Sequence, residues 1–132
     1  MLVKLFEEAG LPKGALNLVV GNGSEIGDVK AAATGLVLGA FAFSGQVSIS
    51  AQRIYVQKGV YEEFLNQYVS TVKDLVIGNP AEESTDIGLM ISEKEAIRAH
   101  NWIQEAVQAG AKLAISGSRN GTLLEQTILV DV

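Results

Sequence analysis

The sequence predicts an α/β fold in which helices pack on a small, mostly parallel β-sheet. Segments with helical periodicity alternate with short aliphatic segments, and the connections between them are short. Such alternation is typical of parallel strands covered by helices. Of the 132 residues, 48% are apolar and none is cysteine, which excludes a disordered chain and a disulfide-bonded scaffold.

The N-terminal part is expected to hold a helix, a strand and an apolar helix. Residues 2–9 pattern as a helix that ends at residues 10–12, where a glycine caps it and a proline cannot continue it. Residues 16–20 are aliphatic except for Asn17 and precede a Gly-Asn-Gly turn, which predicts a strand. Residues 29–44 are apolar on nearly every face, so we expect a helix packed on several sides.

Further helices and strands follow in order. Apolar residues at every third or fourth position predict a helix over residues 60–75. Ser92 and Glu95 form a capping box that opens a second helix, which continues to residue 110. β-Branched and aliphatic runs predict three strands, at residues 53–56, 112–116 and 127–130.

Charge and patterning argue against several classes of partner. Fifteen acidic and ten basic residues give a net charge of −5, the wrong sign for binding a nucleic-acid backbone. The apolar run at residues 31–47 is interrupted by polar residues, so no membrane span is expected. Two acids at positions 7 and 8 rule out a signal peptide there, which predicts a cytoplasmic protein. The paired acids do not converge on one ion, and no metal site is expected.

Short motifs are spread over the chain in a fixed order. They are Gly39-Ala40-Phe41, Ser44-Gly45-Gln46-Val47-Ser48, Gln52-Arg53-Ile54-Tyr55-Val56, Gly78-Asn79-Pro80 and Thr85-Asp86-Ile87-Gly88, flanked by residues 8–21 and 127–132. This series resembles the NAD(P)-dependent aldehyde dehydrogenase superfamily over nearly the whole chain. The resemblance implies the fold of that family's catalytic domain, and oxidation of an aldehyde to a carboxylic acid with NAD or NADP.

The resemblance also implies a division of the chain. Residues 1–28 resemble a relic of the cofactor-binding domain, and residues 29–132 resemble a catalytic-domain α/β unit, the two forming one compact domain. Residues 27 and 28 join two segments that are separated in the family by several dozen residues. Those residues include the general-base glutamate and a loop on the phosphate side of the cofactor. The family's nicotinamide-ribose segment would follow Val132. The chain is therefore expected to lack these parts of the enzyme.

Two residues occupy family site positions. Ser48 stands where the family has its catalytic cysteine, and Gly21 matches a glycine beside the adenine end of the cofactor. A serine hydroxyl needs an adjacent base to act as a nucleophile, and the sequence identifies none near Ser48. The one histidine, His100, lies in the predicted helix at 92–110, and no nucleophile elbow surrounds Ser48. Ser48 is thus predicted to be non-functional, and Gly21 to be a remnant cofactor contact.

Three interpretations of function stay open. The chain is a shortened aldehyde dehydrogenase homologue that is inactive or very weak, with doubtful binding of NAD or NADP. Alternatively, it is a catalytically inactive structural module, a homo-oligomer that self-associates through apolar surface normally covered by the missing part of the enzyme. A deliberately shortened enzyme with cysteine replaced by serine would have the same sequence.

Overall fold

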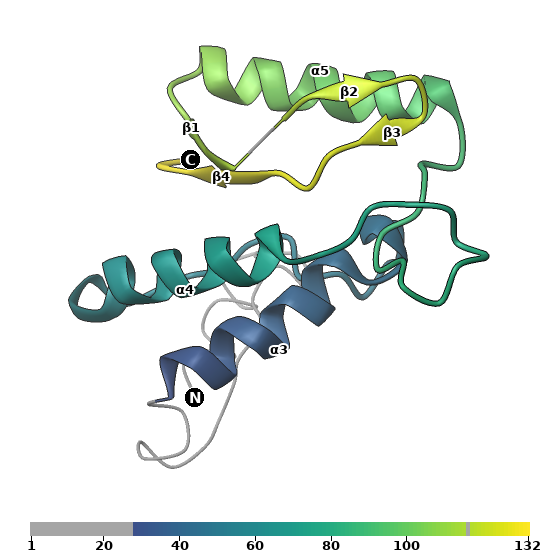
Figure 1. Cartoon of the computed structure of the whole chain (residues 1–132). Coiled ribbons are helices and arrows are strands. Elements are labelled where there is room, and N and C mark those ends of the chain that lie inside the picture. The colour runs from purple at the N-terminus through teal and green to yellow at the C-terminus, as the bar shows by residue number, and fades with distance from the viewer. Residues whose placement is uncertain (1–27, 116) are drawn as a thin grey trace.

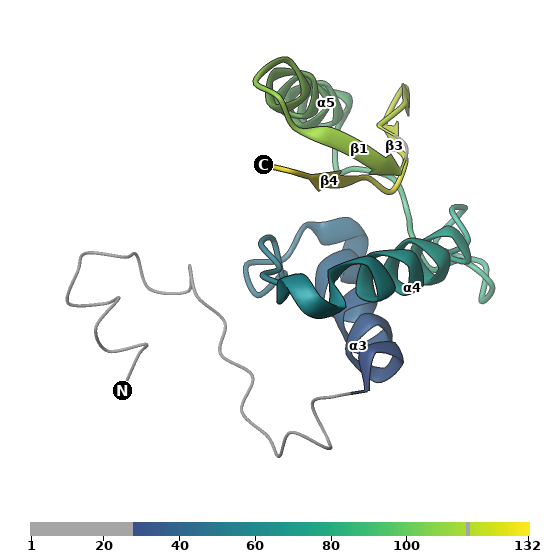
Figure 2. The same cartoon turned by 90° about the vertical axis from the view of Figure 1, so that its left-hand side faces the viewer.

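The computed structural model of the protein describes residues 28–115 and 117–132 (Figure 1). The helix expected at residues 2–9, the strand expected at 16–20 and Gly21 lie outside the described residues. The described part has three levels (Figures 1 and 2). Helix α5 (Glu93–Gln108) lies above the two-stranded β-ribbon formed by β1 (Lys112–Ile115) and β4 (Ile128–Val130), and helices α4 (Tyr61–Lys73) and α3 (Val29–Phe41) lie below it.

Helices α3 (Val29–Phe41) and α4 (Tyr61–Lys73) form the lower part of the molecule. The carboxylate of Asp28 accepts a hydrogen bond from the backbone N–H of Ala31 at 3.0 Å, which caps the start of α3. Short turns adjoin both helices. The 3₁₀ turn η2 (Lys58–Val60) precedes α4, and η1 (Ala42–Gly45), which has non-helical backbone at Phe43 and Ser44, follows α3. The helix predicted at residues 60–75 is therefore confirmed, and the one predicted at residues 29–44 is confirmed as far as Phe41.

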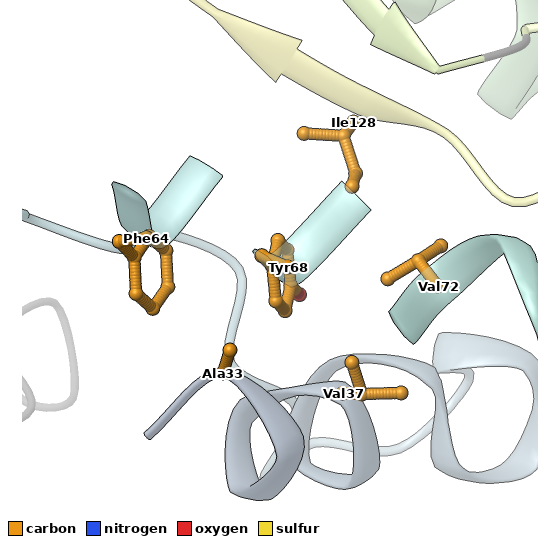
Figure 3. Packing of buried hydrophobic residues seen from close by; sticks show 6 residues of the cluster. All are labelled: Ala33, Val37, Phe64, Tyr68, Val72 and Ile128. Carbon is orange, nitrogen blue, oxygen red and sulfur yellow. The ribbon is translucent and has the colours of Figure 1, made fainter. Parts of the chain in front are cut away.

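The core lies where α3, α4 and the β-ribbon meet. Helix α4 contributes side chains four residues apart, α3 contributes two small ones, and Ile128 reaches down from the ribbon (Figure 3). The buried members of this cluster are Ala33, Val37, Phe64, Tyr68, Val72 and Ile128. The rings of Phe64 and Tyr68 stack with centroids 5.5 Å apart. Burial raises the pKa of the Tyr68 hydroxyl to about 12, because the phenolate would lose its hydration.

The upper part contains helix α5 (Glu93–Gln108) and four short strands, β1 (Lys112–Ile115), β2 (Arg119–Asn120), β3 (Leu123–Leu124) and β4 (Ile128–Val130). The Ser92 hydroxyl accepts a hydrogen bond from the Glu95 backbone N–H at 3.3 Å, which confirms half of the capping box. The Glu95 carboxylate instead accepts a hydrogen bond from Arg98 Nε at 2.7 Å.

The α/β class is confirmed, but the prediction of mostly parallel strands is wrong for the described residues. β1 pairs with β4, and β2 pairs with β3, both antiparallel. Parallel neighbours need a crossover connection, usually a helix, whereas the chain between β1 and β4 is occupied by the β2–β3 hairpin. A single bridge between Ile77 and Ile87 is the parallel pairing found in the described part of the chain.

Two further expectations are corrected. Residues 53–56 form no strand, although Ile54 and Val56 pack against the core and Arg53 and Tyr55 are exposed. The alternation is that of a strand, but no other described segment pairs with it. Helix α3 is packed on one side rather than several by the described residues, because among them α4 covers one stripe of it and Leu38 remains 72% exposed.

Candidate functional site

Ser48 lies in the loop that leaves the end of α3. The Ser50 backbone N–H donates to the Val47 carbonyl oxygen at 3.1 Å, which closes a turn over residues 47–50, called here the position-48 turn. Ser48 is an exposed corner residue of this turn. Its side chain therefore faces solvent on the described part of the molecule.

An unusual backbone run leads into the position-48 turn. Phe43, Ser44 and Gly45 have φ angles of 52°, 58° and 68°, so all three lie in the left-handed region. For Phe43 and Ser44 this conformation costs roughly 1–2 kcal/mol per residue. The Ser44 hydroxyl donates to the Gly88 carbonyl oxygen at 3.1 Å, which helps to hold the strained backbone in place.

Polar contacts tie both sides of the position-48 turn to other elements. Before the turn, the Gln46 Oε1 atom accepts a hydrogen bond from the Ile91 backbone N–H at 3.0 Å. After it, the Ser50 hydroxyl donates to the Ala40 carbonyl oxygen at 3.1 Å, and the Ala51 N–H donates to Gly39 at 2.8 Å. The turn is thus held between the end of α3 and the segment at residues 88–91.

A cavity of about 170 Å³ borders this arrangement. It is lined by the end of α3, the left-handed run, the 87–90 segment and the residues before β4, namely Ala40, Phe41, Ser44, Gly45, Ile87, Gly88, Met90, Leu124, Glu125, Gln126 and Thr127. The Ser118 hydroxyl donates to the Glu125 carboxylate, which therefore already has a partner in the fold.

The chemistry available at Ser48 is limited. Among the described residues, no basic side chain makes a hydrogen bond with the Ser48 hydroxyl. His100 lies on α5, where its buried Nδ1 atom finds no hydrogen-bond partner within the described ranges. A serine hydroxyl without a base is a weak nucleophile. The surroundings of Ser48 within residues 28–132 therefore supply no activation.

The described residues hold neither a metal-binding cluster nor a membrane-spanning helix. Across residues 28–115 and 117–132, no group of three or more metal-ligating side chains comes together. No helix in that part of the chain is both long and apolar enough to cross a membrane.

Comparison with known proteins identifies the family. A family model described as the aldehyde dehydrogenase family matches residues 27–132. The chain belongs to this family. The motif-based prediction is thereby confirmed.

Curated relatives agree with this assignment. The chain is 35% identical to the 3-sulfolactaldehyde dehydrogenase of Priestia aryabhattai over 180 residues, covering 99% of this chain and 38% of the relative. It is 38% identical to the lactaldehyde dehydrogenase of Methanococcus maripaludis over 102 residues, covering 77% of this chain and 22% of the relative. The chain thus spans 22% to 38% of the length of these two relatives.

Solved structures give the same answer for the fold. Aldehyde dehydrogenase 21 of Physcomitrella patens, in complex with the reaction product succinate, is 40% identical with a TM-score of 0.78, covering 81% of this chain and 22% of that one. The glyceraldehyde-3-phosphate dehydrogenase GapN of Methanocaldococcus jannaschii, complexed with NADP, is 35% identical with a TM-score of 0.76, covering 77% and 22%. The predicted resemblance to the aldehyde dehydrogenase fold is confirmed.

Of the two predicted site residues, Ser48 lies among the described residues and Gly21 does not. Ser48 has a defined place at an exposed turn, and its role stays a prediction. Gly21 lies outside the described residues. Sequence reasoning missed the residues that hold the turn, Ser44, Gln46 and Ser50. The available signal was their polarity, since they interrupt an otherwise small and apolar stretch.

Proposed function

We propose that this chain descends from an NAD(P)-dependent enzyme that oxidises an aldehyde to a carboxylic acid, and that by itself it is inactive or very weak in that reaction. Membership of the aldehyde dehydrogenase family supports the first part. The second part is carried by one observation, an exposed serine without an adjacent base at the position of the family's thiol nucleophile.

The reason lies in the nucleophile. Thiol-dependent aldehyde oxidation begins with attack of a thiolate on the aldehyde carbon, and a free cysteine has a pKa of about 8.5 that its surroundings can lower. The hydroxyl of Ser48 ionises far less readily and needs a base to take its proton. No such base contacts Ser48 among the described residues.

The nicotinamide cofactor is proposed from the family alone. GapN of Methanocaldococcus jannaschii was solved with NADP. A pyrophosphate favours uncapped helix N-termini. In the described residues, Asp28 and Ser92 cap α3 and α5, and α4 carries Glu62 and Glu63 in its first turn. These helix starts do not fit a pyrophosphate, so no step of the reaction is assigned to cofactor bound there.

The division into two parts also belongs to this proposal. We propose that residues 1–28 derive from the cofactor-binding domain and that residues 29–132 derive from the catalytic domain. The family match at residues 27–132 supports it. The alignment with 3-sulfolactaldehyde dehydrogenase also supports it. That alignment extends over 180 residues although this chain has 132, so the relative contains residues that have no counterpart in this chain.

Two assays test the proposal, an activity assay on the unaltered chain and an alkylation assay on a variant with a thiol at position 48. The purified chain is mixed with short aliphatic and aromatic aldehydes and NAD or NADP, and reduced cofactor is followed by its absorbance. We expect no turnover above background. The Ser48→Cys variant is then alkylated with and without cofactor, with Ser70→Cys on the exposed side of α4 as the matched control. Clear aldehyde oxidation by the unaltered chain contradicts the proposal.

A second function, self-association, is favoured by apolar side chains around the position-48 turn. Phe43 is 79% exposed, Ile49 90% and Ile91 84%. Phe43 and Ile49 flank Ser48 in sequence, and Ile91 is hydrogen-bonded to Gln46 through its backbone. Large exposed apolar side chains that gather in one region commonly mark interaction sites. We propose that this region mediates homo-oligomer formation.

Light scattering tests self-association. The average mass should rise with concentration over the micromolar range, and Phe43→Ser should weaken the rise. Tyr55→Ser, which removes another strongly exposed aromatic side chain, is the control. A strict monomer throughout that range contradicts this second proposal.

A further inference from the structure

The two sides of the position-48 turn are held in different ways. On the far side, Ser50 and Ala51 bind the last turns of α3 through two hydrogen bonds, at 3.1 Å and 2.8 Å. On the near side, the link closest to residue 48 is the bond from the Ile91 N–H to Gln46 Oε1 at 3.0 Å. The Gln46 backbone N–H also donates to the Phe43 carbonyl oxygen at 3.1 Å, a bond that stays within the left-handed run. The near side is therefore tied to another segment through a side chain, while the far side is tied to α3 through a side chain and a backbone bond.

The partner of Gln46 is itself anchored. The neighbouring Met90 N–H donates to the Thr122 carbonyl oxygen at 3.0 Å, in the loop between β2 and β3. At the other end of the segment, Ile87 is 4% exposed, and its carbonyl oxygen accepts from Gly78 N at 3.0 Å. The 88–91 segment is thus fixed to two parts of the fold, and it can act as a rigid support for the turn.

The backbone before Gln46 needs such a support. The left-handed run at residues 43–45 is a conformation that non-glycine residues leave readily when nothing holds them. The Ser44 hydroxyl fixes residue 44 to Gly88, but Val47 is hydrogen-bonded to neither the 88–91 segment nor α3 within the described residues. The Gln46 side chain bridges this interval.

We propose that Gln46 is a positioning residue, which fixes the orientation of the side chain at position 48 by accepting the Ile91 N–H. The inference rests on the proposed function, since it takes the position-48 turn as the family's nucleophile turn. Gln46 itself touches no reacting atom in this proposal. Its role is to limit the directions in which residue 48 can point, as preorganised sites require.

Spin labelling tests the proposal directly, because the chain contains no cysteine. A nitroxide attached to Ser48→Cys reports motion of the turn, and one attached to Ser70→Cys reports motion of the exposed face of α4. Each label is combined with Gln46→Leu, which cannot accept a hydrogen bond, and with Gln46→Glu, which still can. Gln52→Leu is the matched control, because Gln52 is exposed and makes no side-chain hydrogen bond within the described residues.

The proposal makes a local and reversible prediction. With the label at position 48, Gln46→Leu shortens the rotational correlation time about twofold or more, toward the nanosecond motion of free loops. Gln46→Glu and Gln52→Leu leave it unchanged, and the label at position 70 is unaffected by all three. Unchanged mobility at position 48 in Gln46→Leu overturns the proposal. Equal loosening at position 70, or in Gln46→Glu, also overturns it.

The outcome is separable from that of the proposed function. Label mobility needs neither cofactor nor turnover, so failure of the spin-label test leaves the aldehyde dehydrogenase proposal standing. Aldehyde oxidation by the unaltered chain would contradict the proposed inactivity whatever the label shows.

Discussion

Removing the buried methyl groups of Val72 should test whether the core joins the lower part of the molecule, helices α3 and α4, to the β-ribbon above it. Val72 on α4 is 0% exposed and lies in the cluster that includes Val37 from α3 and Ile128 from β4 (Figure 3). Val72→Ala deletes two buried carbon groups, each contributing about 0.8 kcal/mol, and the remaining cavity adds to the loss. The better helix propensity of alanine returns about 0.5 kcal/mol. We expect a net loss of about 2 kcal/mol in the free energy of unfolding.

The assay is urea unfolding followed by circular dichroism, supported by thermal melting. A loss of about 2 kcal/mol corresponds to a fall in Tm of roughly 8 °C for a chain of this size. Val69→Ala is the matched control, because Val69 lies on the same helix but is only partly buried against the cluster. Its gain in helix propensity offsets most of its smaller burial loss, and a change below about 0.5 kcal/mol is expected. Equal losses in the two variants would refute the assignment of Val72 to the centre of the core.

Three further predictions concern a cap, a buried phenol and a glycine. Ser92→Ala should lower the free energy of unfolding by about 1 kcal/mol in urea, while Ser92→Asp should retain the cap. The pKa of Tyr68 is raised to about 12 in the folded state, whereas in the unfolded chain this phenol ionises near pH 10. Burial of neutral Tyr68 therefore stabilises the fold fully below pH 10, and this stabilisation is lost as the pH rises toward 12. The full shift of two pKa units corresponds to about 2.7 kcal/mol, which we discount to about 1–2 kcal/mol for solvent screening; alkaline melts should show this fall, and Tyr68→Phe should reduce it. Gly117→Ala should lower Tm more than Gly110→Ala, because both have positive φ but a Cβ at position 117 would lie 3.2 Å from a leucine side chain. Equal shifts in the two glycine variants would contradict that reasoning.

The helices were predictable because their signals are local. Apolar spacing places α4 within two residues of its observed ends, and the capping serine places the start of α5. The same reasoning fails for strands, because pairing depends on segments far apart in the chain. Residues 53–56 have the alternation of a strand and find no partner among the described residues. The β2–β3 hairpin was missed inside a loop, although its two-residue connection begins with Gly121, a hairpin signal.

The site divides in the same way. The position of Ser48 was predictable from motif order, since the motif is continuous in sequence. The contacts of Gln46 with Ile91 and of Ser44 with Gly88 join residues 45 and 44 positions apart in the chain. No local pattern reports such a pairing. It depends on how the segment after α4 folds back against the loop that follows α3, which is a property of the packed fold.

Helix α3 links the two proposed functions. Its all-round apolar sequence is typical of a helix covered on several sides, yet α4 covers one stripe, and Leu38 is 72% exposed. The loop at its end carries both Ser48, which bears on catalysis, and Phe43, which bears on self-association. The two roles are separable by mutation, because Ser48→Cys changes the side chain at the proposed nucleophile position without removing apolar surface. Phe43→Ser removes apolar surface without changing that position. If self-association depends on this loop, Phe43→Ser should weaken it while Ser48→Cys leaves it intact. Association unchanged by Phe43→Ser would place the association surface elsewhere.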